Sequence, residues 1–331
     1  MYEFSAYDTL RRNTLSVYSL TSGAATGKRL YTTKTYTDSR LNGTDGADGS
    51  KITNASTVLV ASYVNKFGST GSEVSRFDYT YDNWSNIKSI TNKNNKVRSY
   101  TYNNFGEVSS ATEQYDNGTS KTYAYTYDAG GNILTENVSG TTSTYTYGNN
   151  AWKDLLTGYT TGGHTYAVTY DGAGHPLNYL GAAMTWDNAG NLASIQKGSN
   201  PFLPSATSSV SYTYLANGQR RTKTVGSNTT TYRYNNGLLL SQTTGTGSTA
   251  ETLSFTYDAD GKPVSITYKQ GSNAAVAYFY AYNGQGDVIA IYNSSNSTLV
   301  GSYEYDRKYS TMSTIKRKNR HFTGDSHIFE P

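Results

Sequence analysis

The residues with the clearest potential for acid–base chemistry are His164, Asp171 and His175, which lie in one short stretch. With one of the many serines they supply the residue types of a hydrolase triad, in which a carboxylate orients a histidine that activates a hydroxyl. The stretch has no Gly-x-Ser-x-Gly elbow to present such a nucleophile. Asp171 and His175 instead occupy positions that hold turn residues elsewhere in the sequence. We therefore assign no catalytic residues and expect that the chain is not an enzyme.

Two acidic segments suggest calcium chemistry, one at Asp258 to Gly261 and one at Asp45 to Asp48. A calcium loop of the EF-hand type needs further oxygen ligands and a bidentate glutamate at its end. The first segment lacks these ligands, and Asp and Gly at these spacings are typical of turns. We expect no metal site and no cofactor.

Three tryptophans, Trp84, Trp152 and Trp186, have rings that can stack on sugars. The same rings can also face inward and hold neighbouring strands together. The sequence leaves both interpretations open, so cell-surface glycans are a candidate partner.

These side chains must be positioned by a local element that recurs along the chain. Its pattern is given by residues 125–134, Tyr-Thr-Tyr-Asp-Ala-Gly-Gly-Asn-Ile-Leu. In an extended chain its two tyrosine rings lie on one face. Asp128 can accept a hydrogen bond from the backbone two residues later, while Gly131 and Asn132 tolerate positive φ. The stretch predicts a β-hairpin with a tight turn, and Gly140 is expected in a looser connection.

The pattern of paired aromatics, Asp or Asn, and a glycine recurs along most of the chain. Ten steps separate Tyr81 from Tyr305 and cover 224 residues (305 minus 81), a mean period of about 22. The structural repeat motif comprises Tyr81, Asp82, Tyr102, Gly106, Tyr127, Asp128, Gly131, Asn132, Tyr170, Asp171, Gly174, Trp186, Asp187, Gly190, Tyr257, Asp258, Gly261, Tyr282, Gly286, Asp287, Tyr305 and Asp306.

Composition favours strands over helices. The 331 residues include 33 Tyr and 32 Gly, strong helix formers are sparse, and no segment shows a clear 3.6-residue period. The predicted fold class is all-β, with tandem β-hairpins forming an open spiral sheet or partial shell. Two repeats hold about 45 residues and four strands, so a β-propeller is the alternative.

Three regions differ in how well they carry the pattern. Residues 1–75 are expected to be degenerate β repeats, residues 76–306 the regular array, and residues 307–331 a basic, disordered tail. A loop insertion at residues 196–209 explains the longest step between repeats.

Bulk properties exclude several classes of partner and site. The net charge of +4 and the charged fraction of 16% do not indicate a nucleic-acid partner. The chain has no cysteine, which excludes disulfides and thiolate chemistry. It shows neither a signal-peptide core nor an apolar run of the roughly 18 residues that a membrane span needs. An open spiral sheet would have an unpaired strand edge at each end, and these two edges predict self-association.

Residues 79–87, 125–133 and 255–263 resemble the YD repeats of bacterial Rhs proteins, wall-associated polymorphic toxins and the teneurin shell. Residues 278–292 are similar to a more specific core segment found late in such shells. The resemblance covers residues 76–306 clearly and the preceding region weakly. It implies a hollow shell of hairpins that encases the variable C-terminal toxin of the same chain, in a secreted or cell-surface bacterial protein.

The sequence departs from that family after residue 306, because neither its closing sequence nor a toxin domain follows. We therefore expect a structural shell fragment, whose partners are the remainder of the parent protein or its C-terminal toxin. A carbohydrate-binding or adhesion module is the alternative function.

Overall fold

The computed structural model describes residues 2–20, 29–37, 57–198, 209–303, 305–306 and 309–312. Apart from the short 3-10 helix η2 (Gly247–Thr249), all regular structure in this part of the chain is β-strand. The all-β class is confirmed. The candidate calcium loop at Asp45 to Asp48 and most of the expected insertion at 196–209 lie outside the described residues.

The chain divides into two compact units, one of residues 1–97 with 253–331 and one of residues 98–252. Unit 1 contains β1 (Tyr2–Tyr7), β2 (Asn13–Ser19), β3 (Leu30–Tyr36), β4 (Val60–Phe67), β5 (Glu73–Tyr81), β6 (Ile87–Asn92), β21 (Glu251–Tyr257), β22 (Pro263–Gln270), β23 (Val276–Tyr282), β24 (Val288–Asn293), β25 (Leu299–Ser302), β26 (Tyr305–Asp306) and β27 (Tyr309–Met312).

Unit 2 contains the strands between them. These are β7 (Val97–Tyr102), β8 (Val108–Gln114), β9 (Ser120–Tyr127), β10 (Ile133–Val138), β11 (Thr141–Thr146), β12 (Gly158–Thr161), β13 (His164–Ala167), β14 (Asn178–Tyr179), β15 (Ala182–Trp186), β16 (Leu192–Gln196), β17 (Ser209–Tyr214), β18 (Arg220–Val225), β19 (Asn228–Asn235) and β20 (Leu238–Thr244).

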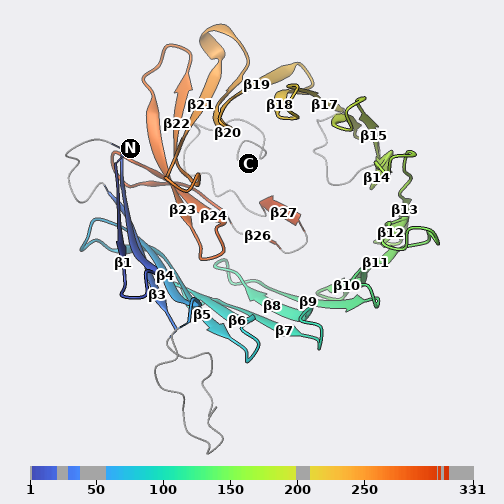
Figure 1. Ribbon diagram of the computed structural model, residues 1–331, viewed down its shortest axis with the longest axis horizontal. Helices are drawn as coiled ribbons and strands as arrows, with labels where there is room; N and C mark the ends of the chain where they lie inside the picture. Colours follow the sequence, from blue (N-terminus) through green and yellow to red (C-terminus); the bar gives the residue numbers. More distant parts are fainter. Residues whose placement is uncertain are drawn as a thin grey trace, which may run out of the picture. The chain divides into compact units, whose positions relative to one another are not determined.

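Within each sheet, neighbouring strands are consecutive in the sequence, and the colours in Figure 1 follow that order. In unit 1 this pairing runs without a break from β1 to β6. In unit 2 it runs from β7 to β13 and from β14 to β20. Runs of six and seven strands exceed the four strands of a propeller blade, so the tandem-hairpin architecture is confirmed and the propeller alternative does not fit.

The hairpins share a register shift at the last aromatic of Tyr-x-Tyr. In β5 and β6, Thr80 pairs with Ser89, but Tyr81 pairs with Ile87, which leaves one residue of β6 as a bulge. The middle residue of the motif lies on the face opposite the rings, where its hydroxyl meets another across the hairpin. Such exposed pairs are Thr80 with Ser89, Thr126 with Thr135, Thr185 with Ser194, and Thr213 with Thr222.

The core of unit 1 joins the two ends of the chain. β23 differs from the other strands because residues 278–282 are buried without alternation. Phe279 and Tyr292 from β23 and β24 pack on Phe67 of β4, with ring centroids 6.1 and 5.5 Å apart. Figure 1 shows these strands beside β1–β5. Leu30, Ala281 and Ala290 complete the buried cluster.

Two polar contacts fix this docking. Asn65 is 1% exposed, and its amide nitrogen donates to the Tyr282 carbonyl at 2.8 Å. The Tyr79 hydroxyl accepts the Gly284 N–H at 2.8 Å. A buried amide with satisfied hydrogen bonds favours one docking position over others.

The segments outside the regular array also contain strands. Residues 1–75, expected to be degenerate repeats, include β1 to β4, and β5 begins at their end. In the expected tail, β27 pairs with β26. The other residues after 306 lie outside the described part of the chain.

The repeat turn as candidate functional site

The repeated feature with a fixed side-chain geometry is a five-residue turn, here called the repeat turn, with positions 1 to 5. In residues 128–132, Asp128 at position 1 accepts hydrogen bonds from the N–H groups of Gly130 and Asn132, at 2.8 and 2.9 Å. The Asp128 N–H donates to the Asn132 carbonyl, and the Gly131 N–H donates to the Asp128 carbonyl. The carboxylate therefore holds the turn closed by binding its own backbone.

The same bonds occur in turn after turn. Backbone N–H groups at positions 3 and 5 donate to the position 1 side chain of Asp8, Asp82, Asn92, Asn103, Asp128, Asp171, Asp187, Asp258 and Asn283.

In most of these turns the side chain at position 5 complements the side chain at position 1. Where position 1 is the acceptor Asp187, position 5 is the donor Asn191, whose amide lies 3.1 Å from the carboxylate. Where position 1 is Asn283, position 5 is Asp287, which accepts from the amide at 2.8 Å. This pairing was not predicted from the sequence, although acid and amide residues four positions apart are visible in it.

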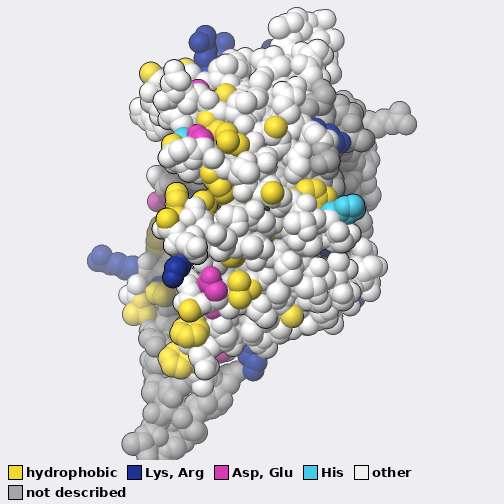
Figure 2. Space-filling view, turned by 90° about the vertical axis from the view of Figure 1, so that its right-hand side faces the viewer, with side chains coloured by type: hydrophobic (Ala, Val, Ile, Leu, Met, Phe, Trp, Pro, Cys, Tyr) yellow, Lys and Arg dark blue, Asp and Glu magenta, His cyan; other side chains and the backbone are white. Residues whose placement is uncertain are grey.

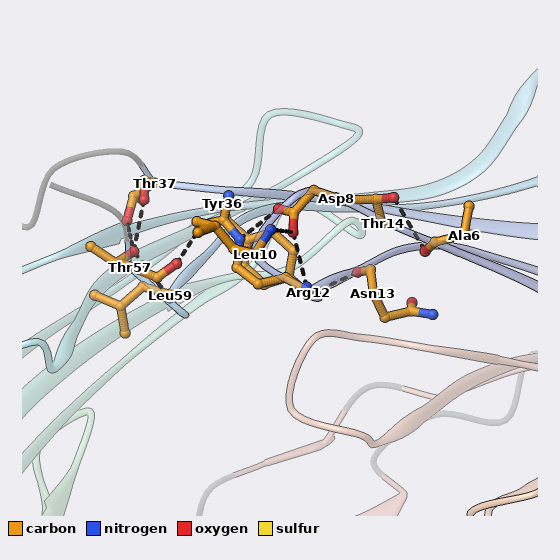
Figure 3. A network of polar contacts seen from close by, with 10 residues as sticks. All are labelled: Ala6, Asp8, Leu10, Arg12, Asn13, Thr14, Tyr36, Thr37, Thr57 and Leu59. Carbon is orange, nitrogen blue, oxygen red and sulfur yellow. Dashed lines mark hydrogen bonds and ion pairs between the residues drawn. The ribbon is translucent and has the colours of Figure 1, made fainter. Parts of the chain in front are cut away.

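The first repeat turn shows how position 5 extends the network to neighbouring strands (Figure 3). Arg12 forms an ion pair with Asp8, with Nε 2.6 Å from the carboxylate. Its guanidinium also lies 4.6 Å from the Tyr36 ring centroid and donates to the Thr57 carbonyl at 2.5 Å. One side chain thus connects the β1–β2 turn, the end of β3 and the segment before β4.

Position 4 is the left-handed position of the turn. Gly131 has φ 87° and Gly174 has φ 87°, a region that favours glycine. Asn132 is not among the residues with positive φ; it occupies position 5 and donates to Asp128. Ser139 and Gly140 (φ 94°) form a two-residue connection between the paired Val138 and Thr141, so our expectation of a looser connection there is wrong.

At several of these glycines a side chain from another segment packs close to the α carbon. A Cβ on Gly131 would lie 2.9 Å from Glu107, on Gly174 2.9 Å from the Trp152 ring, and on Gly190 3.1 Å from His175. A Cβ on Gly106 would meet nothing within 4 Å. Glycine therefore serves both the turn and the packing between turns at the first three positions.

In several hairpins the last aromatic before the turn forms a hydrogen bond to the preceding hairpin. The Tyr127 hydroxyl donates to the Val108 carbonyl at 2.7 Å, and the Tyr170 hydroxyl donates to the Leu156 carbonyl at 2.7 Å. The same bond is made by Tyr36, Tyr81, Tyr147, Tyr214 and Tyr282, to Asn13, Val60, Ile133, Leu192 and Pro263 respectively. We call this bond the tyrosine clamp.

Trp186 replaces tyrosine in the clamp. Its indole Nε1–H donates to the Pro176 carbonyl at 2.8 Å. The clamp requires a long aromatic with a donor at its end, and both residue types supply one. This role accounts for Trp186 without a sugar ligand.

The structure brings together two of the three residues considered for acid–base chemistry. His175 at position 5 lies with Nδ1 2.9 Å from the Asp171 carboxylate and stacks on Trp186 at 4.8 Å between ring centroids. His164 lies on β13 with an exposed side chain. Among the described residues, no hydroxyl is bonded to the His175 ring. Asp171 and His175 thus form a complementary pair of the repeat turn.

The hydrogen bonds of the turn hold its carboxylates in the charged form. The side-chain and backbone bonds from Asn132 lower the pKa of Asp128, and the bonds from His175 lower that of Asp171. The backbone bond from Asn191 is the main cause of the lowered pKa of Asp187. Each pKa falls because the bonds are made to the ionised carboxylate.

The remaining motif residues follow the same positions. Asp258 closes a repeat turn through the N–H groups of Asp260 and Lys262, and no group of three metal-ligating side chains occurs in the described ranges. Tyr102, Tyr257 and Tyr282 end β7, β21 and β23, while Gly261 and Gly286 are at position 4 with positive φ. Tyr305 and Asp306 form β26.

Two tryptophans expose their rings. Trp84 at position 3 of its turn is 85% exposed, and Trp152 is 53% exposed. On the face shown in Figure 2, charged side chains are few and hydrophobic side chains are scattered among the other groups. No helix among the described residues is long and apolar enough to cross a membrane.

Curated proteins are similar in sequence to part of this chain. The chain is 33% identical over 193 residues to the tRNA3(Ser)-specific nuclease WapA of Bacillus spizizenii, which covers 58% of this chain and 8% of that protein. It is 30% identical over 193 residues to the tRNA nuclease WapA of Bacillus subtilis, again over 58% of this chain and 8% of that protein. This similarity supports the resemblance to Rhs-type YD-repeat proteins. No family model matches it.

Solved structures share the YD-repeat fold. The chain superimposes on the crystal structure of TcdB2-TccC3-TEV with a TM-score of 0.65 and 16% identity, over 95% of this chain and 16% of that chain. The Tc holotoxin pore of Photorhabdus luminescens gives a TM-score of 0.68 at 16% identity, with the same coverage. The chain thus spans a small part of the proteins that it resembles.

Proposed function

We propose that this chain is a section of the β-repeat shell of a larger secreted or cell-surface Rhs-like protein, and that the shell encases a C-terminal toxin of the same polypeptide. The observation that carries the proposal is the repeat turn with its tyrosine clamp, which links several hairpins to the ones before them. Such a linkage builds an extended wall without a compact core for each repeat. The similar segments make up only a small share of much longer proteins, which supports the same role.

In this proposal the chain's own residues carry out no reaction. Asp171 and His175, the acid–histidine pair considered for catalysis, are accounted for by the turn. The nuclease activity in the names of the curated relatives would belong to another part of such proteins.

Protection of the toxin tests the proposal. The full reading frame that contains this sequence is expressed with the native repeats or with Gly174→Asn, and trypsin digestion of the downstream region is followed by mass spectrometry. Gly106→Asn is the matched control, since it changes an equivalent but open position. We expect the downstream region to resist trypsin except in the Gly174 variant. Equal digestion in all three proteins would contradict a protective shell.

A second candidate function is glycan binding, favoured by the exposed rings of Trp84 and Trp152. Binding of the chain to a glycan array or to isolated cell walls would support it if Trp84→Ala and Trp152→Ala each reduced the signal. Retention of full binding by both variants would exclude these rings as the site.

Self-association through strand edges belongs to the same proposal. β1 is the edge strand of the sheet in unit 1. Unpaired backbone groups at a sheet edge are a template for another chain. Sedimentation velocity over a range of protein concentrations should show oligomers, and a monomer at every concentration would contradict the prediction.

A further inference from the structure

Asparagine is followed directly by glycine at five places in the sequence, and four of these Asn-Gly steps lie in the described part of the chain. The four are Asn117–Gly118, Asn217–Gly218, Asn236–Gly237 and Asn283–Gly284. Asparagine is a chemically labile residue. A glycine after it offers no Cβ to block the approach of the backbone nitrogen to the asparagine side chain. Because the following residue is the same at all four steps, differences in reactivity must come largely from the fold.

At three of these steps the glycine N–H already has a hydrogen-bond partner. At Gly118 and Gly218 it donates to the carbonyl three residues earlier, at 3.0 and 2.9 Å. At Gly284 it donates to the Tyr79 hydroxyl at 2.8 Å. A nitrogen in such a bond must release its partner before it can act as a nucleophile, which costs free energy.

The asparagine side chains at the same three steps are held as well. The side-chain oxygens of Asn117 and Asn217 accept the backbone N–H two residues later, at 3.0 and 3.2 Å. The Asn283 amide donates to Asp287 at 2.8 Å, and its oxygen accepts two backbone N–H groups of the repeat turn. These bonds oppose rotation of each side chain onto the glycine nitrogen.

Asn236 and Gly237 lack both restraints. They form the two-residue connection between β19 and β20, and both are exposed. Among the described residues, neither the Asn236 side chain nor the Gly237 N–H has a hydrogen-bond partner. The rotation that brings the two groups together is therefore opposed neither by packing nor by a hydrogen bond.

We propose that Asn236 and Gly237 form a self-modification site, at which the chain converts its own asparagine to isoaspartate and aspartate. The Gly237 nitrogen attacks the carbonyl carbon of the Asn236 side chain, and the bond from that carbon to the amide nitrogen breaks. The amide nitrogen leaves as ammonia with the proton of the Gly237 N–H, and a cyclic imide remains. One water then opens the imide. Opening at the backbone carbonyl gives isoaspartate, and opening at the side-chain carbonyl gives aspartate. One water is consumed and one ammonia is released, without oxidation or reduction.

The two products differ in their effect on a contact between hairpins. The Gln219 amide donates to the Gly237 carbonyl at 3.1 Å, which connects the turn after β17 with the turn after β19. Isoaspartate adds one carbon to the backbone directly before Gly237. A two-residue hairpin connection has a defined turn geometry, so the added carbon displaces the carbonyl from Gln219. Aspartate adds a negative charge but leaves the backbone length unchanged.

Peptide mapping of the full chain tests the site. The folded protein is incubated at pH 7.4 and digested at intervals, and mass spectrometry follows the conversion of amide to acid at each step. Loss of one hydrogen bond costs enough to slow attack by ~3- to 10-fold. Asn236 should therefore react at least ~3-fold faster than each of Asn117, Asn217 and Asn283. Equal rates at the four steps, or no reaction at Asn236, would overturn the proposal.

The same chain in urea is the control, and it needs no variant. Without the fold, all four asparagines precede a glycine in a mobile chain, so their rates should converge. Convergence supports the role of the fold, whereas an unchanged spread of rates would assign the difference to neighbouring residues and overturn the structural argument.

The variant Tyr79→Phe tests whether a bonded nitrogen is protected. It removes the acceptor of the Gly284 N–H and should accelerate the reaction of Asn283 in the folded chain, with the rate at Asn236 unchanged. An unchanged rate at Asn283, in a variant with native circular dichroism, would show that this bond does not protect the step.

Hydrogen exchange tests the effect of the added carbon. The isoaspartate form is separated from the unmodified chain by anion exchange, and Asn236→Asp is the control with the same charge and an unchanged backbone length. Exchange in β19 and β20 should be faster in the isoaspartate form than in Asn236→Asp. Equal exchange in the two would show that the added carbon does not disturb the hairpin.

Discussion

Gly106 and Gly174 hold the same left-handed position in their turns, but only Gly174 has a ring against its α carbon. Gly106→Asn should lower the free energy of unfolding by about 1 kcal/mol, because asparagine tolerates this backbone region at a modest cost. Gly174→Asn should cost about 1–3 kcal/mol more, since the Trp152 ring must move. Urea denaturation of the two variants measures the difference, and equal costs would show that the packing between turns is unimportant.

The tyrosine clamp can be tested by removing one oxygen atom. Tyr127→Phe deletes the hydroxyl that donates to the Val108 carbonyl and should destabilise the protein by about 1–2 kcal/mol. Tyr166→Phe is the control, because the Tyr166 hydroxyl has no hydrogen-bond partner among the described residues. Thermal unfolding should separate the two variants, and equal melting temperatures would count against the clamp.

At the scale of single residues, the sequence indicated which positions belong to the repeat motif. It indicated less well what the side chain at each position contacts. Aspartate followed by glycine at a fixed spacing is local, so the turn at Asp128 and Gly131 was predictable from chain chemistry alone. The clamp was not predictable, because the donor and its carbonyl are separated by variable distances: 14 residues at Tyr170 and 22 at Tyr214. Those distances depend on connections between strands that carry no fixed length.

The complementary pair predicts that acid and amide can be exchanged within a turn. Asn191→Asp places a second carboxylate beside Asp187 and should lower the urea midpoint at pH 7, because like charges repel. Adding Asp187→Asn should restore stability, since the turn at Asn283 and Asp287 already uses that order. A double-mutant cycle measures the coupling. If the effects of the two substitutions simply add, the pair is not coupled.

The turn carboxylates predict how the array responds to acid. Asp128, Asp171 and Asp187 have lowered pKa values in the folded chain, against about 3.9 when unfolded. A lowered folded pKa gives stability that is present above the unfolded value and is lost as the pH falls through the folded one. These groups should therefore leave the urea midpoint of the protein constant between pH 7 and about pH 5. Below about pH 4 they should lower it.

Asparagine provides the control for this acid response. Asp128→Asn and Asp187→Asn keep an oxygen for the backbone N–H groups but cannot titrate. A variant with both changes should lose less stability in acid than the native chain. The same acid-induced loss in both proteins would assign it to other groups.

At the scale of elements, strands and most turns followed from period and composition, but one turn type did not. Asn236 and Gly237, with φ 48° and 84°, form a two-residue connection between β19 and β20. The sequence at this point resembles that of the five-residue turns, because an aromatic and an asparagine precede the glycine there. Asn-Gly is the preferred pair for a two-residue hairpin, so the local signal was present.

The docking of β23 and β24 on β4 is a property of the whole of unit 1. Phe279→Ala should destabilise unit 1 by about 3–5 kcal/mol, because the ring is 0% exposed in a packed cluster. Hydrogen exchange should then accelerate in β3 and β4, which are remote in sequence. Leu299→Ala, at a residue that is 36% exposed, is the control and should have little effect. Unchanged exchange in β3 and β4 would contradict the shared core.

This docking was beyond sequence reasoning, although one sign of it was present. Residues 276–282 form an uninterrupted apolar and aromatic run, which is typical of a strand covered on both faces. No periodic pattern identifies the partner of such a strand, so a continuous spiral was the natural expectation. The buried amide of Asn65 was equally hidden, since its value depends on three strands meeting around it.

The same docking delays the completion of folding while the chain is being synthesised. Asn65 and Tyr282 are 217 residues apart, and a ribosome adds ~5–20 residues per second, so the first strands wait on the order of 10–40 seconds for the segment that covers them. During that interval the faces of Leu30 and Phe67 are open to solvent and to other nascent chains. Slower translation or loss of a chaperone should therefore reduce the yield of folded protein more than its final stability would suggest.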